Sequence, residues 1–238
     1  MKRYGLVGRE LGHSFSKEFF NKKFKQLDLK NYYYENYELE SLSGLKELIN
    51  KKNLSGINIT TPYKEKILNH LDIIDNTAKK IGSVNTIKIH NNKLVGFNTD
   101  IIGFEKSILF AIKKRKNALI LGDGGASKAV QYVFKKNNIK TTIISRKSSR
   151  NYNNLTKEDI INNLIIINTT ILGMYPDIKS YPKIPYEYLN KNHLVYDLVY
   201  NPKKTKFLEK AEKQGSHIIN GYQMLKKQAN EAWTIWQN

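Results

Sequence analysis

A glycine-rich loop between two apolar runs is the feature that most constrains the fold of this chain. Residues 118–121 are a short apolar run that leads directly into "GDGGA" at 122–126, and a second run follows at 141–145. Between them, apolar side chains recur at helical spacing, at Ala129, Val130, Val133 and Phe134. Because a strand, a tight turn, a helix and a second strand make a βαβ unit, this stretch predicts a parallel sheet covered by helices.

The glycine loop also gives the first functional indication. Gly122, Gly124 and Gly125, followed by Ala126, would let the backbone approach a pyrophosphate, whose charge the N-terminus of the next helix stabilises. The loop keeps only part of the GxGxxG pattern, and the Asp123 carboxylate would repel a phosphate unless it points away. An ordinary glycine-rich turn is the alternative, but the complete βαβ context favours a dinucleotide site.

The residues after the second strand indicate which dinucleotide binds. NAD enzymes commonly place an acidic side chain there, against the ribose 2′-hydroxyl. This chain instead has "SRKSSR", in which Ser145 is followed by Arg146 and Lys147, and Arg150 closes the run. These cations would attract a 2′-phosphate, which an arginine can bind with two hydrogen bonds. The sequence therefore predicts NADP; the alternative is ordinary basic surface.

The first hundred residues predict another α/β unit. Three short apolar runs, "YGLVG", "NYELES" and "SGINIT", each precede a segment with helical spacing, and this order predicts a mainly parallel sheet. "VNTIKIHNNKLVGFNT" then predicts a hairpin with Asn91 and Asn92 in its turn. The unit is expected to end near Asp100.

The segment "NITTPYKEKI" raises a question about one lysine. Thr61 and Pro62 predict the start of a helix, with a hydroxyl cap and a proline at the first helical position. Lys64 would then lie in the first turn, where the helix dipole disfavours a cation. Because the chain is rich in lysine, this placement alone leaves a surface charge and a catalytic ammonium both open.

Two further segments carry polar side chains that could bind a ligand. Ser14 and Ser16 in "GHSFS" stand just before an aromatic helix, where two convergent hydroxyls suit a carboxylate, although an ordinary serine cap fits equally well. Gln228 lies on the inner stripe of the last helix, where its amide must be hydrogen-bonded to the protein or to a ligand.

Composition excludes some classes and leaves one open. The chain has no cysteine, which excludes disulfides and fits the cytoplasm, and its five histidines show no metal-ligand spacing. No run is long and apolar enough to span a bilayer, and no secretory signal is recognisable. The net charge of +19 is spread along the chain, so compositional drift explains it better than a nucleic-acid surface, which stays as an alternative.

Seven segments together are more specific than any one of them. "GHSFS", "NITTPYK", "VNTIKI…GFNTD", "LGDGGASKAV", "NTTILGM", "YDLVYNP" and "NGYQMLKKQA" occur in the order and spacing of the shikimate dehydrogenase family, which the chain resembles from Gly5 to Trp236. The resemblance implies an α/β protein with a substrate-binding domain (residues 1–100 plus 221–238) and a Rossmann-like NADP-binding domain (101–220). It also implies a small-molecule substrate and disfavours nucleic acid as a partner; we expect a monomer or homodimer with no metal and no membrane.

The resemblance also assigns roles to individual positions. Lys64 and Asp100 match the catalytic pair. The positions that match substrate contacts are Ser14, Ser16, Thr60, Asn85, Tyr200 and Gln228, with Asp100 also near a ring hydroxyl. The positions that match the cofactor side are Gly122, Gly124, Gly125, Ala126, Ser145, Arg146, Lys147, Asn168, Thr169, Met174 and Gly221. Asp123 and Ser145 depart from the small residue and the Asn that are more frequent in the family.

The activity implied is the NADPH-dependent, reversible reduction of 3-dehydroshikimate to shikimate. Adding a hydride to a ketone creates an alkoxide, and a proton donor within hydrogen-bond reach lowers the barrier. A helix N-terminus would lower the pKa of Lys64 and a carboxylate at Asp100 would raise it, which suits a proton shuttle. The alternatives are a quinate/shikimate dehydrogenase that uses NAD, a member of the methylenetetrahydrofolate dehydrogenase group, and a basic nucleic-acid-binding protein on the same scaffold.

Overall fold

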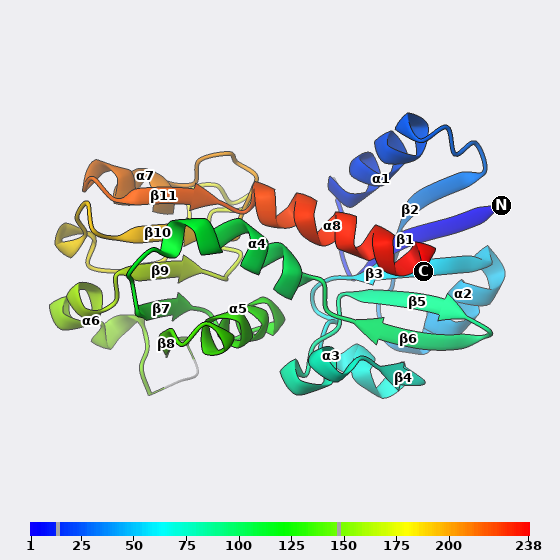
Figure 1. Ribbon diagram of the computed structural model, residues 1–238, viewed down its shortest axis with the longest axis horizontal. Helices are drawn as coiled ribbons and strands as arrows, with labels where there is room; N and C mark the ends of the chain where they lie inside the picture. Colours follow the sequence, from blue (N-terminus) through cyan, green and yellow to red (C-terminus); the bar gives the residue numbers. More distant parts are fainter. Residues whose placement is uncertain (13–14, 147–148) are drawn as a thin grey trace. The chain divides into compact units, whose positions relative to one another are not determined.

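The computed structural model describes residues 1–12, 15–146 and 149–238, and the chain divides into two units (Figure 1). The first unit comprises Met1–Thr99 and Ala229–Asn238, and the second comprises Asp100–Gln228. Each unit is built around its own sheet, so the two are described separately.

The first unit contains a six-stranded sheet with the order β2-β1-β3-β5-β6-β4. The strands are β1 (Lys2–Gly8), β2 (Tyr32–Glu38), β3 (Leu54–Ile59), β4 (Ile73–Ile74), β5 (Thr86–His90) and β6 (Lys93–Phe97). β1 pairs in parallel with β2 and β3, and β4 with β6, whereas the β5–β6 hairpin enters antiparallel beside β3. The predicted α/β class is confirmed, with a mixed sheet.

Two helices predicted from apolar spacing are present in this unit. They are α1 (Phe15–Gln26) and α2 (Leu45–Lys52), the latter preceded by the short 3-10 helix η1 (Leu42–Gly44); α3 (Asn76–Ile81) follows β4. Aromatic side chains from α1, β1, β2 and the last helix make one core cluster, in which Tyr4 stacks on Trp236 and Phe20 on Tyr34, each pair with ring centroids 4.6 Å apart. Such contacts hold residues 229–238, the C-terminal part of the last helix, in the first unit.

The predicted hairpin is confirmed, and the predicted position of the second strand is wrong. Asn91 and Asn92 both have positive φ, 49° and 58°, as a two-residue hairpin turn requires. The second strand, in contrast, covers the tyrosine-rich residues 32–38 rather than "NYELES", because Tyr34 and Tyr37 are the side chains that point into the core.

No α-helix begins at Thr61 and Pro62, where the sequence predicted one. The Thr61–Pro62 peptide bond is cis, and the Tyr63 N–H donates to the Thr60 carbonyl at 2.9 Å, so this proline occupies the third position of a turn. Lys64 lies in the next turn, ahead of the 3-10 helix η2 (Lys66–His70). The helix-dipole argument for Lys64 therefore does not apply.

The second unit contains five strands, all parallel, in the order β11-β10-β9-β7-β8. They are β7 (Asn117–Leu121), β8 (Lys140–Ile144), β9 (Ile165–Asn168), β10 (Leu194–Asp197) and β11 (His217–Asn220). The chain runs from β7 outward to β8 and then returns to the other side of β7 to form β9. Ligands of open parallel sheets bind where the strand order reverses in this way, outside the carboxyl ends of the strands.

Helices cover both faces of this sheet, as in a Rossmann-like fold. On one face α4 (Asp100–Ile112) packs against α5 (Gly125–Lys136), and Phe104 contacts Phe134 and Tyr196 with centroids 5.4 and 5.5 Å away. On the other face α6 (Lys157–Asn162) and α7 (Lys206–Lys213) close an aliphatic core around Leu121 and Ile166. The remaining elements are the 3-10 helices η3 (Tyr152–Asn154) and η4 (Tyr186–Tyr188), and α8 (Tyr222–Gln237).

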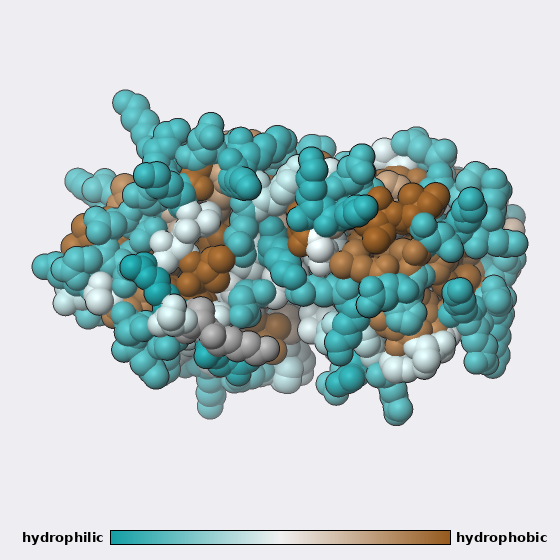
Figure 2. All heavy atoms as spheres, turned by 90° about the horizontal axis from the view of Figure 1, so that it is seen from below, coloured by the Kyte–Doolittle hydropathy of each residue, from teal (hydrophilic) through white to brown (hydrophobic). Residues whose placement is uncertain are grey.

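Across the described ranges, no helix combines the length and the apolar character that a bilayer-spanning segment needs. Figure 2 shows one face of the molecule, on which hydrophilic residues are spread widely and alternate with smaller apolar areas.

Candidate functional site

The predicted site residues of the second unit gather at the carboxyl ends of its parallel strands. Gly122 follows β7, Ser145 follows β8, Thr169 follows β9, Tyr200 lies three residues after β10, and Gly221 follows β11. Because parallel strands end at the same edge of a sheet, these residues lie along one edge, where open α/β sheets bind their ligands.

The glycine loop is shaped for close approach of a ligand to the backbone. Gly122 has φ +116°, and a Cβ there would lie 2.5 Å from the Thr169 Oγ1, so the position requires glycine. Gly124 is the N-cap of α5, and a Cβ added there would meet no atom within 4 Å. α5 is a helix of twelve residues that starts at Gly125, and its first N–H groups have no partner within the helix, which suits an anion.

Asp123 and Arg146 lie on the same part of this edge. Both side chains are exposed, and both act electrostatically on the Tyr152 hydroxyl, the arginine lowering its pKa and the aspartate raising it, although burial is the largest effect and leaves that pKa at about 12. Ser145 is buried, at 4% exposure. Lys147 lies outside the described residues.

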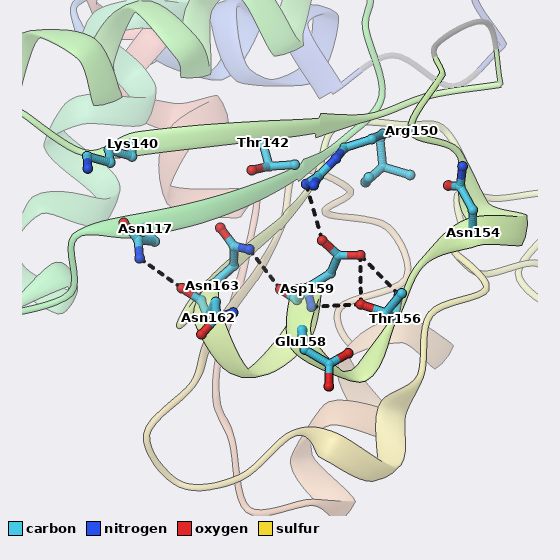
Figure 3. Close-up of a pocket in the computed structure, with 11 residues that line it drawn as sticks. Asn117, Lys140, Thr142, Arg150, Asn154, Thr156, Glu158, Asp159, Asn162 and Asn163 are labelled. Atoms are coloured by element: carbon cyan, nitrogen blue, oxygen red, sulfur yellow. Dashed lines mark hydrogen bonds and ion pairs between the residues drawn. The ribbon is translucent and has the colours of Figure 1, made fainter.

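A polar pocket of about 520 Å³ lies along β8, and among its described lining residues Arg150 is the only one that the sequence analysis associated with the cofactor. Figure 3 shows Lys140 and Thr142 of β8 on one side and α6 on the other, with the Arg150 guanidinium pointing toward Asp159, 3.2 Å away. The same carboxylate caps α6 by accepting from the Thr156 N–H. One N–H group of Arg150, which the sequence associated with a 2′-phosphate, therefore donates to Asp159.

The loop after β9 is anchored to the end of β7 and to β10. The Thr169 N–H and hydroxyl both donate to the Leu121 carbonyl, at 2.9 and 2.8 Å. Asn168 is fully buried, and its amide donates to Asp197 and to the Leu172 carbonyl while accepting from Thr170. Asn168 thus shapes the loop from inside. Met174 is 39% exposed and presents its side chain to solvent.

Gly221 and Tyr200 are linked through the loop after β10. The Gly221 N–H donates to the Val199 carbonyl at 3.2 Å. A Cβ on Gly221 would lie 2.0 Å from the Leu198 carbonyl oxygen, far inside van der Waals contact. The start of α8 therefore packs directly on the backbone of the segment that carries Tyr200.

Asp100 and Gln228 come from two helices of the second unit that pack closely. A Cβ on Gly103 of α4 would lie 2.7 Å from the Met224 carbonyl oxygen and 2.8 Å from the Gln228 Cβ. Asp100 is buried at 6% exposure and lies one helical turn before Gly103, on the same side of α4. Gln228 thus packs against α4 one helical turn after Asp100.

In the first unit, the predicted substrate residues belong to a buried chain of hydrogen bonds. Ser16 interacts with the Tyr34 hydroxyl, which donates to the Asn58 Oδ1 at 2.8 Å. Asn58 donates to the Thr86 Oγ1 at 3.0 Å and to the Asn85 carbonyl at 3.2 Å. Asn85 in turn accepts from the Thr99 N–H at 2.7 Å and donates to its hydroxyl at 3.0 Å. Ser14 lies outside the described residues.

Thr60 and Lys64 lie beside this chain of hydrogen bonds. The Thr60 N–H donates to the Val7 carbonyl of β1, and the Lys64 carbonyl accepts from the Val84 N–H at 2.8 Å, one residue before Asn85. Thr60 follows β3, and Asn85 precedes the antiparallel strand β5. These residues therefore share the edge of the sheet at which β1 and β3 end.

Supporting residues in each of the two units were missed by the sequence analysis. Asn58 and Thr99 are buried polar side chains that hold Asn85, and Asp197 does the same for Asn168. The available signal was a polar residue at the end of an apolar strand, as in "GINIT" and "LVYD". Among the residues that the structure describes, no group of three or more His, Asp or Glu side chains is arranged to hold a metal ion.

Comparison with known proteins agrees with this arrangement. Residues 6–87 match the family model of the shikimate dehydrogenase substrate binding domain. The shikimate dehydrogenase (NADP(+)) of Methanococcus aeolicus is 41% identical over 256 residues, which cover 99% of this chain and 91% of that protein.

Solved structures extend the comparison over the whole fold. Shikimate 5-dehydrogenase of Thermus thermophilus, in complex with NADP(H) and shikimate, matches with a TM-score of 0.88 and 30% identity, covering 99% of this chain and 93% of that one. The enzyme of Listeria monocytogenes, in complex with shikimate and NAD, matches with a TM-score of 0.85 and 28% identity, covering 100% and 92%. Because 99% of its length aligns with the Methanococcus aeolicus enzyme at 41% identity, the chain belongs to the shikimate dehydrogenase family.

Proposed function

We propose that this protein is an NADP-dependent oxidoreductase that interconverts 3-dehydroshikimate and shikimate, a step toward chorismate and the aromatic amino acids. The observation that carries the proposal is the 41% identity along 99% of the chain to a shikimate dehydrogenase (NADP(+)). The grouping of the matching polar residues at one edge of each sheet supports it. The absence of cysteine from the sequence supports work in the cytoplasm.

The roles of the two units follow from the residues that each contains. The unit with the six-stranded sheet binds the substrate, with the hydroxyls of Ser14 and Ser16 on the carboxylate and Thr60 and Asn85 on the ring hydroxyls. The unit with the five-stranded sheet binds NADP through the glycine loop, with Arg146 on the 2′-phosphate. Tyr200, Gln228 and Asp100 are the other residues that we expect to contact the substrate.

The glycine loop fits a dinucleotide on structural grounds. Glycine is required at residue 122, the position of a Cβ on residue 124 is open, and α5 begins directly after it at Gly125. NADPH, when bound, supplies the hydride that adds to the ring carbonyl carbon. Lys64 gives a proton to the oxygen as that bond forms, and Asp100 orients the Lys64 ammonium and a neighbouring hydroxyl.

The decisive test is an absorbance assay of the purified protein with shikimate and NADP. Replacing Lys64 with Ala should lower kcat by several orders of magnitude with a modest change in KM, because a proton donor acts in the transition state. Lys66→Ala is the matched control, since Lys66 is an exposed lysine two residues away. Turnover of Lys64→Ala close to the wild-type value would remove this residue from the mechanism.

Two alternative functions can each be tested separately. A quinate/shikimate dehydrogenase that uses NAD is favoured by the NAD complex of the Listeria relative, and a higher kcat/KM with NAD than with NADP would establish it. Nucleic-acid binding rests on the charge of +19 alone, and a salt series with RNA or DNA would reveal it as a steep loss of affinity. Membership of the shikimate dehydrogenase family argues against a methylenetetrahydrofolate dehydrogenase.

A further inference from the structure

Asp197 is a buried carboxylate at the end of β10 to which the sequence comparison assigned no role. Its exposure is 0%. Its Oδ1 accepts from the Asn168 Nδ2 at 2.9 Å and from the Val199 N–H at 3.0 Å, and its Oδ2 accepts from the Thr205 hydroxyl at 2.5 Å. All three donors are neutral groups, so hydrogen bonds to polar neighbours take the place of an ion pair.

The three donors belong to three different segments around the cofactor edge. Asn168 ends β9, and its Oδ1 fixes both the N–H and the hydroxyl of Thr170, at 3.0 and 2.7 Å. Val199 begins the loop that carries Tyr200 and contacts Gly221. Thr205 is the N-cap of α7. One carboxylate therefore ties the loop after β9, the loop after β10 and the start of α7 together.

Keeping this side chain ionised costs free energy. Burial raises the pKa of Asp197 to about 6, even though the hydrogen bonds from Thr205, Val199 and Asn168 each lower it. The titratable groups that face it are Tyr186 of η4 and Tyr196 of β10, and burial raises the pKa of both far enough that they stay neutral near pH 7. A neutral residue at this position would avoid the desolvation free energy of the carboxylate. Buried charges that lower stability in this way are concentrated at functional sites.

We propose that Asp197 is a positioning residue for NADP binding, whose ionised carboxylate holds the loops after β9 and β10 in the geometry that the cofactor requires. A hydrogen bond to a charged acceptor is about twice as strong as one to a neutral acceptor, so the ionised form fixes the two loops more tightly than the protonated form does. The inference rests on the proposed function, because it assigns those loops to the cofactor.

The test compares NADPH dissociation constants of wild type and Asp197→Asn, measured by NADPH fluorescence without substrate, between about pH 5 and about pH 8. The amide oxygen of Asn still accepts from Asn168 and Val199, but its NH₂ group faces the Thr205 hydroxyl and carries no charge. The ratio of the two constants cancels titration of the cofactor's own 2′-phosphate. Glu209→Gln, an exposed change of the same kind on α7, is the control.

The expected ratio is near one at low pH, where wild-type Asp197 is protonated, and rises through about pH 6 to about fivefold, the effect of one weakened charged hydrogen bond. Thr205→Val removes a hydrogen bond that lowers the pKa of Asp197. When Thr205→Val is introduced into both proteins, the rise in the ratio should therefore shift to higher pH, and Thr205→Ser should return the rise to the original pH. A ratio near one throughout, or one that does not change with pH, would overturn the role of Asp197. A wild-type protein that binds no NADPH would overturn the proposed function itself, and the inference with it.

Discussion

Replacing Asp197 with Asn should make the protein more stable at pH 8, while it weakens NADPH binding. The carboxylate is fully buried, and its pKa is raised from the ordinary value of 3.8 to about 6, chiefly by desolvation. A group whose pKa is higher in the folded state holds its proton longer there than in the unfolded chain. Its contribution to stability is therefore present at low pH and is lost as the pH rises through about 4 to 6.

The size of this contribution follows from the two pKa values. Their difference, at about 1.4 kcal/mol for each pKa unit, gives ~3 kcal/mol of lost stability above pH 7. Asn keeps the shape of Asp and cannot ionise, so Asp197→Asn should gain up to this amount at pH 8. At pH 5 the gain should be about half as large, because the folded carboxyl is then largely protonated while the unfolded one is not.

The assay is urea unfolding of wild type and variant at each pH, followed by circular dichroism. Comparing the two proteins at the same pH cancels all other titrating groups, and Glu209→Gln again controls for the loss of one negative charge. A variant that is less stable than wild type at pH 8 would show that the hydrogen bonds of the carboxylate outweigh its desolvation. A stability difference that is the same at pH 5 and pH 8 would refute the raised pKa.

Three further changes test other parts of the site. Tyr34→Phe removes the buried donor to the Asn58 Oδ1 and should cost about 1–3 kcal/mol in urea unfolding and raise the KM for shikimate. Arg146→Leu should lower kcat/KM for NADP about tenfold or more and leave kcat/KM for NAD nearly unchanged in the absorbance assay, because only NADP carries the 2′-phosphate. Gly221→Ala places a methyl group 2.0 Å from the Leu198 carbonyl oxygen, so it should lower the melting temperature by several degrees and raise the KM for NADP.

The sequence predicted best where one short pattern decides the structure. The apolar strand, glycine loop and helical stripe of residues 118–134 became β7, the loop and α5, because each step of that pattern is local. The turn at Asn91 and Asn92 was equally clear, since few residues other than Gly, Asn and Asp adopt positive φ readily. NADP as the family's cofactor agrees with the names of the relatives.

The predictions failed where a choice depended on distant residues. Thr61 and Pro62 fit a helix start in sequence, but the hydrogen bond from the Tyr63 N–H to the Thr60 carbonyl places the proline within a turn. The strand at residues 32–38 was missed because its polar residues and tyrosines show no regular alternation, and Tyr34 and Tyr37 are buried in two different core clusters. The roles assigned to Lys64 and Asp100 stay predictions.

The supporting residues of the site could not be predicted, because their partners lie far apart in the chain. Asn85 depends on Thr99 and Asn58, and Asn168 depends on Asp197, through hydrogen bonds that no periodicity records. The two networks nevertheless differ in a way that matters for function. The described bonds of the first network join groups that stay neutral near pH 7, including Tyr34, whose pKa burial raises further. The second contains a carboxyl that titrates near pH 6. As the pH falls, the hydrogen bonds that support the NADP loops should therefore weaken before those that support the substrate residues. For the same reason, Asp197→Asn should change the KM for NADP and leave the KM for shikimate unchanged.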